Sequence, residues 1–141
     1  MSVPGRDQLI AVYQRASGVE SLTVHQMGSL CHQCGIDKGV VAKVMDAGHF
    51  RSVVDVDKFL FLLLAMTCES FAAVVEGIFS LFGNELLTQR FITLISHLAP
   101  DMDPEITTQF LSDLSSTLLD EESVTFTSVM ELEVLQPKLA Q

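Results

Sequence analysis

The pattern of apolar and polar residues changes its period within one short stretch, residues 53–66, with the sequence VVDVDKFLFLLLAM. Valines alternate with aspartates over residues 54–57, which is the period of a half-buried strand, whereas residues 59–66 are apolar throughout and predict a buried helix. β-Branched residues favour strands, while Leu, Ala and Met favour helices. Asp57 falls near the expected helix start, where a carboxylate can accept hydrogen bonds from free N–H groups. The stretch therefore predicts a short strand that leads directly into a helix.

The order helix, loop, short strand, helix recurs about four times along the chain. Gly, Pro and Asp at the ends of apolar-periodic stretches mark the expected helices. Polar and acidic residues over Ser115–Ser123 predict a loop, and the polar residues TCES divide the repeats into lobes at 1–67 and 68–141. The expected helices are 7–18, 25–35, 37–48, 59–66, 70–82, 88–98, 103–114 and one after Phe126. The four strand-like points are Leu22–Val24, Val54–Val56, Leu86–Leu87 and Val124–Phe126.

Four segments in this order resemble the calmodulin superfamily, and more closely its degenerate members such as the myosin light chains. The likeness covers roughly residues 7–135. It implies an all-α fold of two EF-hand-like lobes, each with two helix–loop–helix units whose loops exchange a very short antiparallel ladder. The segments are LTVHQMGSLCHQCG (22–35), VDVDKFLFLLLAM (54–66), GIFSLFG (77–83) and MDPEITTQFLSDL (102–114).

None of the four expected loops retains the full set of ligands that an EF-hand needs for calcium. A working loop supplies oxygen ligands at positions 1, 3, 5 and 12, a carbonyl at 7 and a glycine at 6. With the apolar strand residue set as position 8, Lys58 stands where the bidentate glutamate is required, and Arg15 and Val19 occupy ligand positions of the first loop. The third loop, between Phe82 and Leu87, is too short, and Leu119 takes a ligand position in the fourth. The sequence predicts that ordinary EF-hand calcium binding is lost.

Charge and composition narrow the classes of partner. The 141 residues carry 8 Lys and Arg against 18 Asp and Glu, a formal net charge of −10. Such a chain is poorly suited to nucleic acid or an anionic membrane as its main partner, and it favours a basic one. The longest apolar run, residues 59–66, is too short to span a bilayer, and residues 1–8 have no signal-peptide core. With an odd number of cysteines as well, we expect a cytoplasmic protein. The resemblance to myosin light chains implies that it is also associated with the cytoskeleton.

The sequence contains one candidate motif for a metal or redox site and no recognisable catalytic motif. Cys31 and Cys34 form a Cys-x-x-Cys pair, but a structural zinc site needs four ligands and no second close pair exists. Packing of these thiols in the core is the preferred interpretation, with zinc or redox chemistry as alternatives. His49 and His97 are isolated, and no hydrolase, metalloprotease or Walker motif is present. We therefore expect neither an enzyme nor a cofactor.

The resemblance implies a calcium-independent light chain or adaptor that grips an amphipathic, basic, IQ-like helix of a larger protein, such as a myosin heavy chain or another motor or cytoskeletal protein. Two alternatives remain: a helical scaffold subunit that uses the same fold for protein interaction, and a protein with a residual metal site, either calcium in the fourth loop or zinc at Cys31 and Cys34. The expected partner-binding residues are apolar positions on four helices: Leu30, Cys31, Leu60, Leu63, Leu64, Met66, Leu94, Ile95, Leu98, Leu111, Met130 and Leu132.

Overall fold

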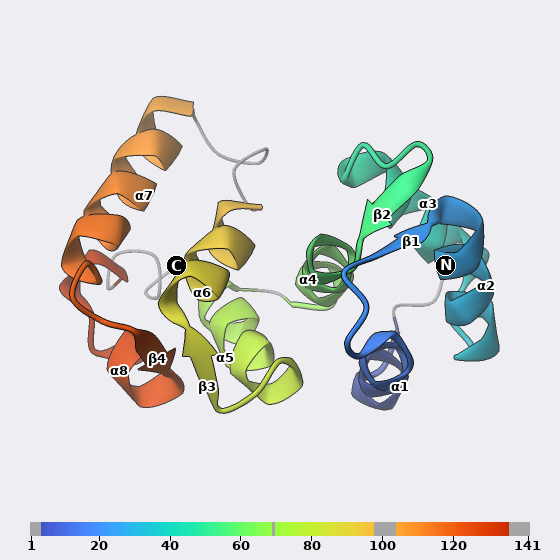
Figure 1. Ribbon diagram of the computed structural model, residues 1–141, viewed down its shortest axis with the longest axis horizontal. Coiled ribbons are helices and arrows are strands. Elements are labelled where there is room, and N and C mark those ends of the chain that lie inside the picture. The colour runs from blue at the N-terminus through green and yellow to red at the C-terminus, as the bar shows by residue number, and fades with distance from the viewer. Residues whose placement is uncertain (1–3, 69, 98–103, 136–141) are drawn as a thin grey trace. The chain divides into compact units, whose positions relative to one another are not determined.

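The computed structural model describes residues 4–68, 70–97 and 104–135, with the side chains of 104–107 and 134 left aside, and Figure 1 shows it as helices with two small sheets. The chain divides into two compact units, Met1–Cys68 and Glu69–Gln141, and this boundary lies one residue from the division expected at the TCES break. The expected mainly helical class with very short strands is confirmed. Among the described residues, no helix is long and apolar enough to cross a membrane.

Each unit contains two helix–strand–helix segments, numbered one to four along the chain. In the first unit they are α1 (Arg6–Ala16), β1 (Ser21–Thr23) and α2 (Val24–Gln33), followed by α3 (Lys38–Ala47), β2 (Val53–Asp55) and α4 (Val56–Met66). In the second unit they are α5 (Phe71–Leu81), β3 (Glu85–Leu87) and α6 (Thr88–Ser96), followed by α7 (Pro104–Thr117), β4 (Ser123–Thr125), α8 (Phe126–Met130) and the 3₁₀ turn η2 (Glu133–Leu135).

The two strands of each unit pair with one another in an antiparallel ladder, which Figure 1 shows as adjacent arrows. Leu22 is opposite Val54 in the first unit, and Leu86 is opposite Val124 in the second. Leu86, Val54 and Val124 are buried, so the centre of each ladder contributes to the apolar core. Pairing at these residues agrees with the register chosen from sequence for the first, second and fourth segments. In the third segment the strand centre is Leu86, because Leu87 points outward.

The helix that follows the second strand begins earlier than the change of period suggests. α4 starts at Val56, and Asp55 caps it by accepting a hydrogen bond from the Lys58 amide at 3.0 Å. The expected position of Asp57 near the helix start is confirmed, since Asp57 belongs to the first helical turn. The strand ends at Asp55 and does not continue to residue 57, where the alternation of Val and Asp ends. A cap at Asp55 satisfies a free N–H group that a longer strand would leave without a partner.

The predicted loop over Ser115–Ser123 was also wrong at both ends. α7 continues to Thr117, whose hydroxyl donates to the Asp113 carbonyl at 2.8 Å, and β4 begins at Ser123. Leu118 is buried and its amide donates to the Leu114 carbonyl, so the four-residue apolar spacing persists beyond the polar side chains. The four-residue spacing of Leu114 and Leu118 is visible in the sequence. It predicts the extent of the helix better than the polar side chains between the two leucines do.

Both cores are rich in aromatic residues. In the first unit Phe59, Phe61 and Met27 are fully buried. In the second, the ring of Phe79 lies 5.6 Å from that of Phe91 and 6.1 Å from that of Phe126, measured between centroids. Aromatic pairs at these separations add to the free energy gained by burial, so each unit has a defined core that fixes its loops.

Candidate functional site

A lysine of the chain itself is placed against the loop of the second segment. Lys58 follows the strand centre Val54 by four residues, where the resemblance to EF-hands places the bidentate carboxylate. Its ammonium nitrogen lies 3.3 Å from the carbonyl oxygen of Gly48, to which it donates, and 5.5 Å from the centroid of the Phe50 ring. The loop therefore surrounds a cation that is covalently part of the protein, held by a carbonyl dipole and an aromatic face.

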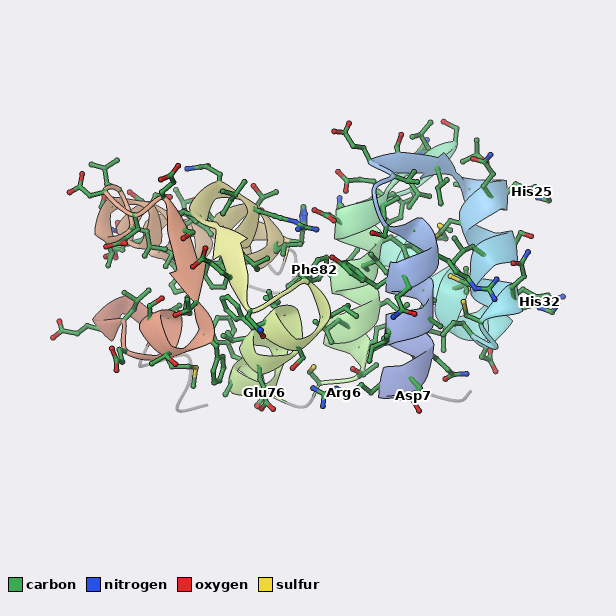
Figure 2. All side chains as sticks on the ribbon, turned by 60° about the horizontal axis from the view of Figure 1, so that its bottom comes forward. Arg6, Asp7, His25, His32, Glu76 and Phe82 are labelled. Atoms are coloured by element: carbon green, nitrogen blue, oxygen red, sulfur yellow. The ribbon has the colours of Figure 1, made fainter. Side chains whose placement is uncertain are left out.

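The third segment repeats this arrangement with different residues. The guanidinium carbon of Arg90 lies 5.1 Å from the centroid of the Phe82 ring. Phe82 precedes the strand centre Leu86 by four residues and Arg90 follows it by four, as Phe50 and Lys58 do around Val54. Phe82 is buried at the end of α5 and is labelled in Figure 2. We call the pairs Lys58–Phe50 and Arg90–Phe82 the cation–ring contacts.

The first and fourth segments use uncharged capping boxes at the equivalent positions. In the first, the Thr23 hydroxyl accepts from the Gln26 amide and the Gln26 side chain accepts from the Thr23 amide, both at 3.0 Å. In the fourth, Thr125 and Ser128 make the same reciprocal pair at 3.2 and 2.9 Å. Each ladder thus joins one segment with a capping box to one segment with a cation–ring contact.

The backbone around Gly48 is shaped to bring the ring of Phe50 under Lys58. A Cβ atom added at Gly48 would lie 2.3 Å from a carbon of that ring, so only glycine leaves room for it. The next residue, His49, has φ of 54°, in the left-handed region that few residues other than glycine adopt. This close turn places both the ring and the Gly48 carbonyl beside the ammonium.

The loop of the second segment does not supply the carboxylates that an EF-hand loop uses for calcium. Ala47, His49 and Arg51 stand at the expected ligand positions of the second loop, and none of them provides a carboxylate. Within residues 4–68, 70–97 and 104–135, no group of three or more His, Cys, Asp or Glu side chains is arranged to hold a metal ion. At Lys58, where the resemblance to EF-hands implies a calcium ligand, the structure instead places a positive charge beside the Gly48 carbonyl.

The two cysteines of the Cys-x-x-Cys pair have different surroundings. Cys31 is fully buried on α2, whereas Cys34 ends that helix and is half-buried, and both are free thiols. Burial, together with the nearby Cys34 thiol, raises the pKa of Cys31 from 9.0 to about 12. A thiol with such a pKa is protonated and unreactive near neutral pH. The interpretation that Cys31 packs in the core is confirmed.

The expected partner-binding residues fall into three groups. Six are buried within the chain: Cys31, Leu60, Leu63, Leu64, Leu94 and Ile95. Five keep some exposure: Leu30, Leu111, Met130 and Leu132, which are half-buried, and Met66, which is 36% exposed. Leu98 lies outside the described residues. Among the eleven described side chains of this set, six are therefore covered within the chain, and the role of the set in binding remains a prediction.

The cation–ring contacts were missed in the sequence, although the signal was present. Phe50 and Lys58 are separated by seven residues, and Phe82 and Arg90 have the same separation, each pair centred on a buried strand residue. In the sequence Lys58 indicates only that a carboxylate is absent. The signal for the contact is the aromatic residue that lies four positions before the strand centre in the second and third segments.

Comparisons with known proteins add no family assignment. No family model matches the chain, and no curated protein matches it.

Proposed function

We propose that this chain is an EF-hand-like protein-interaction module that works without calcium and binds a basic amphipathic helix of a larger protein, in the manner of a light chain or adaptor. A myosin heavy chain or another cytoskeletal motor is the class of partner that the resemblance suggests. The observation that carries the proposal is the pairing of Leu22 with Val54 and of Leu86 with Val124, between helix–strand–helix segments whose loops lack an ion-ligand set. Two segments joined through their loop strands are what the resemblance to a paired EF-hand lobe implies, and this agreement supports the proposal.

The tethered cations explain how such a module could remain folded without an ion. In the second segment the ammonium of Lys58 donates a hydrogen bond to the Gly48 carbonyl and also contacts the face of the Phe50 ring. Arg90 and Phe82 make the corresponding contact in the third. Because these charges cannot dissociate, binding of the partner would be constitutive rather than triggered.

The charge of the chain supports a basic partner. A net charge of −10 raises the encounter rate with a positively charged helix and opposes binding to anionic surfaces. The half-exposed Leu30 and Leu111 are candidates for first contact, since they need no rearrangement to reach a partner. The buried leucines of α4 would take part only if the helices of the first unit separate on binding.

The experiment is affinity capture from a eukaryotic extract under chelating conditions, followed by cross-linking and peptide mapping. We expect one basic amphipathic segment to be retained without calcium and lost by Leu30→Asp or Leu111→Asp. Val19→Asp is the matched control, because Val19 is a 41% exposed apolar residue outside the predicted set. Capture of acidic segments only, or capture that requires calcium, would contradict the proposal. A substitution at Leu63 is less informative, since that fully buried side chain supports the fold itself.

A scaffold role without a gripped helix is the second candidate. It is favoured by α4, of which Val56, Phe59, Leu60, Phe61, Leu63 and Leu64 are already buried within the chain. A unit whose apolar side chains are already buried would bind a partner through its outer surface rather than through its core. Cross-links distributed over several elements, with none to a single basic helix, would favour this candidate.

A further inference from the structure

One residue departs from a rule that the other three segments obey. The residue after each strand centre is the N-cap of the following helix, and in three segments its side chain accepts a hydrogen bond from the helix: Thr23, Asp55 and Thr125. In the third segment this position holds Leu87, which makes no side-chain cap hydrogen bond. A leucine is among the poorest N-cap residues, so α6 gives up stabilisation that the other helices receive.

Leu87 is also exposed to an extent unusual for a large apolar side chain. It is 64% exposed, and Leu119 is 79% exposed, the two highest values among the large apolar residues that the structure describes. Both residues line the same hollow in the second unit, between the start of α6 and the end of α7. We call this hollow the Leu87 groove; it is lined by Leu87, Thr88, Gln89, Ile92, Ser115, Leu118, Leu119, Glu121 and Glu122.

The two sides of the Leu87 groove are fixed to each other by Thr88. Its hydroxyl donates to the Glu121 carbonyl at 2.6 Å, and its amide donates to the Glu122 carbonyl at 3.1 Å. Thr88 is 5% exposed, the one buried polar side chain identified in the described part of the chain. The groove is therefore held in shape before anything binds, which lowers the entropic cost of binding.

The Leu87 groove is lined by apolar and polar side chains, and the charged side chains among them are all negative. Leu87, Ile92 and Leu119 supply the apolar surface, Glu121 and Glu122 are exposed carboxylates, and no lysine or arginine is among the lining residues. A bound segment would bury its own apolar side chain against the leucines and place a cation against the glutamates. An anionic lipid surface or an acidic peptide would instead be repelled.

We propose that the Leu87 groove is a docking site for a segment of another protein that presents an apolar side chain beside a lysine or arginine. The site uses a leucine where the fold itself would be better served by a threonine or aspartate. It lies apart from the predicted light-chain residues and does not depend on the opening of either unit. The proposal therefore stands whether or not the chain grips an IQ-like helix.

The test uses the full chain and two synthetic peptides. One is an amphipathic Leu/Lys peptide with a fluorescent label, and the other has glutamate at every lysine position. Binding is measured by fluorescence anisotropy, and the contact is mapped from amide chemical shifts. We expect the Leu/Lys peptide to bind, to be weakened by added salt, and to shift the amides of Leu87, Ile92 and Leu119.

Leu87→Thr is the decisive variant, because it should change two properties in opposite directions. Removal of the leucine surface should weaken binding by about tenfold, while restoration of a cap should raise the melting temperature. Val53→Thr is the matched control: Val53 is a 58% exposed strand residue of the first unit, and its replacement should leave peptide binding unchanged.

Four outcomes would overturn the proposal. Equal binding of the glutamate peptide would remove the role of charge, and unchanged binding by Leu87→Thr would remove the role of the leucine. Shifts confined to α4 or to other predicted light-chain residues would place the peptide elsewhere, which would leave the proposed function intact while rejecting this site. Association of the chain with itself, lost in Leu87→Thr without any peptide binding, would identify the occupant as a second copy and contradict the proposed partner.

Discussion

The ammonium of Lys58 lies 5.5 Å from the centre of the Phe50 ring, and the guanidinium carbon of Arg90 lies 5.1 Å from the centre of the Phe82 ring. In both pairs the aromatic residue precedes a buried strand centre by four residues and the cation follows it by four. Two loops with little sequence in common therefore contain the same kind of cation–ring contact. The relation explains how a loop without ion ligands keeps a fixed shape, and it gives the first of the predictions.

Lys58→Met should lower the free energy of unfolding by about 1 kcal/mol, since it removes the cation from a half-buried ring while keeping an apolar stem. The measurement is denaturant unfolding of the variant beside the parent chain. Lys43→Met is the control, because Lys43 is exposed on α3 and its replacement should change stability little. Equal effects at the two positions would show that the contact does not stabilise the loop.

Lys58→Glu should not create a calcium site, although it restores the carboxylate at the position that EF-hands use for a bidentate ligand. Ala47, His49 and Arg51 still provide no carboxylate. Calorimetric titration with calcium should show no stoichiometric binding in either the parent or the variant. Tight binding by the variant would mean that the ligand positions of this loop have been wrongly assigned.

Gly48→Ala should destabilise the first unit by about 1 to 3 kcal/mol, because the new methyl group would lie 2.3 Å from the Phe50 ring and force it away from Lys58. Gly28→Ala is a matched control in the same unit. Gly28 lies within α2 with no atom within 4 Å of an added Cβ, so alanine there should stabilise by up to about 1 kcal/mol. Thermal unfolding of both variants distinguishes a loss of space from a general effect of replacing glycine.

Leu87→Thr should stabilise the second unit by about 1 kcal/mol, since it supplies the N-cap that α6 lacks. The reverse change at the equivalent position, Thr125→Leu, should destabilise by a similar amount, because Thr125 accepts the Ser128 amide. Unfolding measured by circular dichroism checks both. If Leu87→Thr is destabilising, the leucine supports the fold and is not held for a partner.

The stability of the first unit should fall as the pH rises above about 9. Burial raises the pKa of Cys31 from 9.0 to about 12, so in this range the unfolded chain releases the thiol proton and the folded chain keeps it. Deprotonation therefore favours unfolding, and the stabilisation present below pH 9 is lost progressively toward pH 12. Melting temperatures of the parent and of Cys31→Val across this range should diverge, with a flatter profile for the variant.

Much of the fold was accessible from the sequence because the helix ends carry strong local signals. Asp37 and Ser70 cap α3 and α5 by accepting hydrogen bonds from the amides of Gly39 and Ala73, and both residues lie at the starts of the helices expected over 37–48 and 70–82. The strands were predictable because apolar residues there alternate with polar ones. The antiparallel pairing itself was expected only through the resemblance, since contacts between distant residues are not encoded in local periodicity.

The site was less accessible because it depends on contacts across a loop. Lys58 and Phe50 are brought together by a backbone turn at Gly48 and by the left-handed conformation of His49, neither of which a pattern of apolar residues reports. Leu87 was interpreted as part of a weak strand, and only its exposure and its place at a helix cap distinguish it from a core residue. Such features emerge when the four segments are aligned on their strand centres.

The ammonium of Lys58 is joined covalently to the chain, so its effective concentration at the Gly48 carbonyl and the Phe50 ring does not depend on the ionic composition of the solution. A chelator cannot remove this cation. The positive charge beside the loop of the second segment is therefore set by the amino-acid sequence and is carried into every folded copy of the first unit.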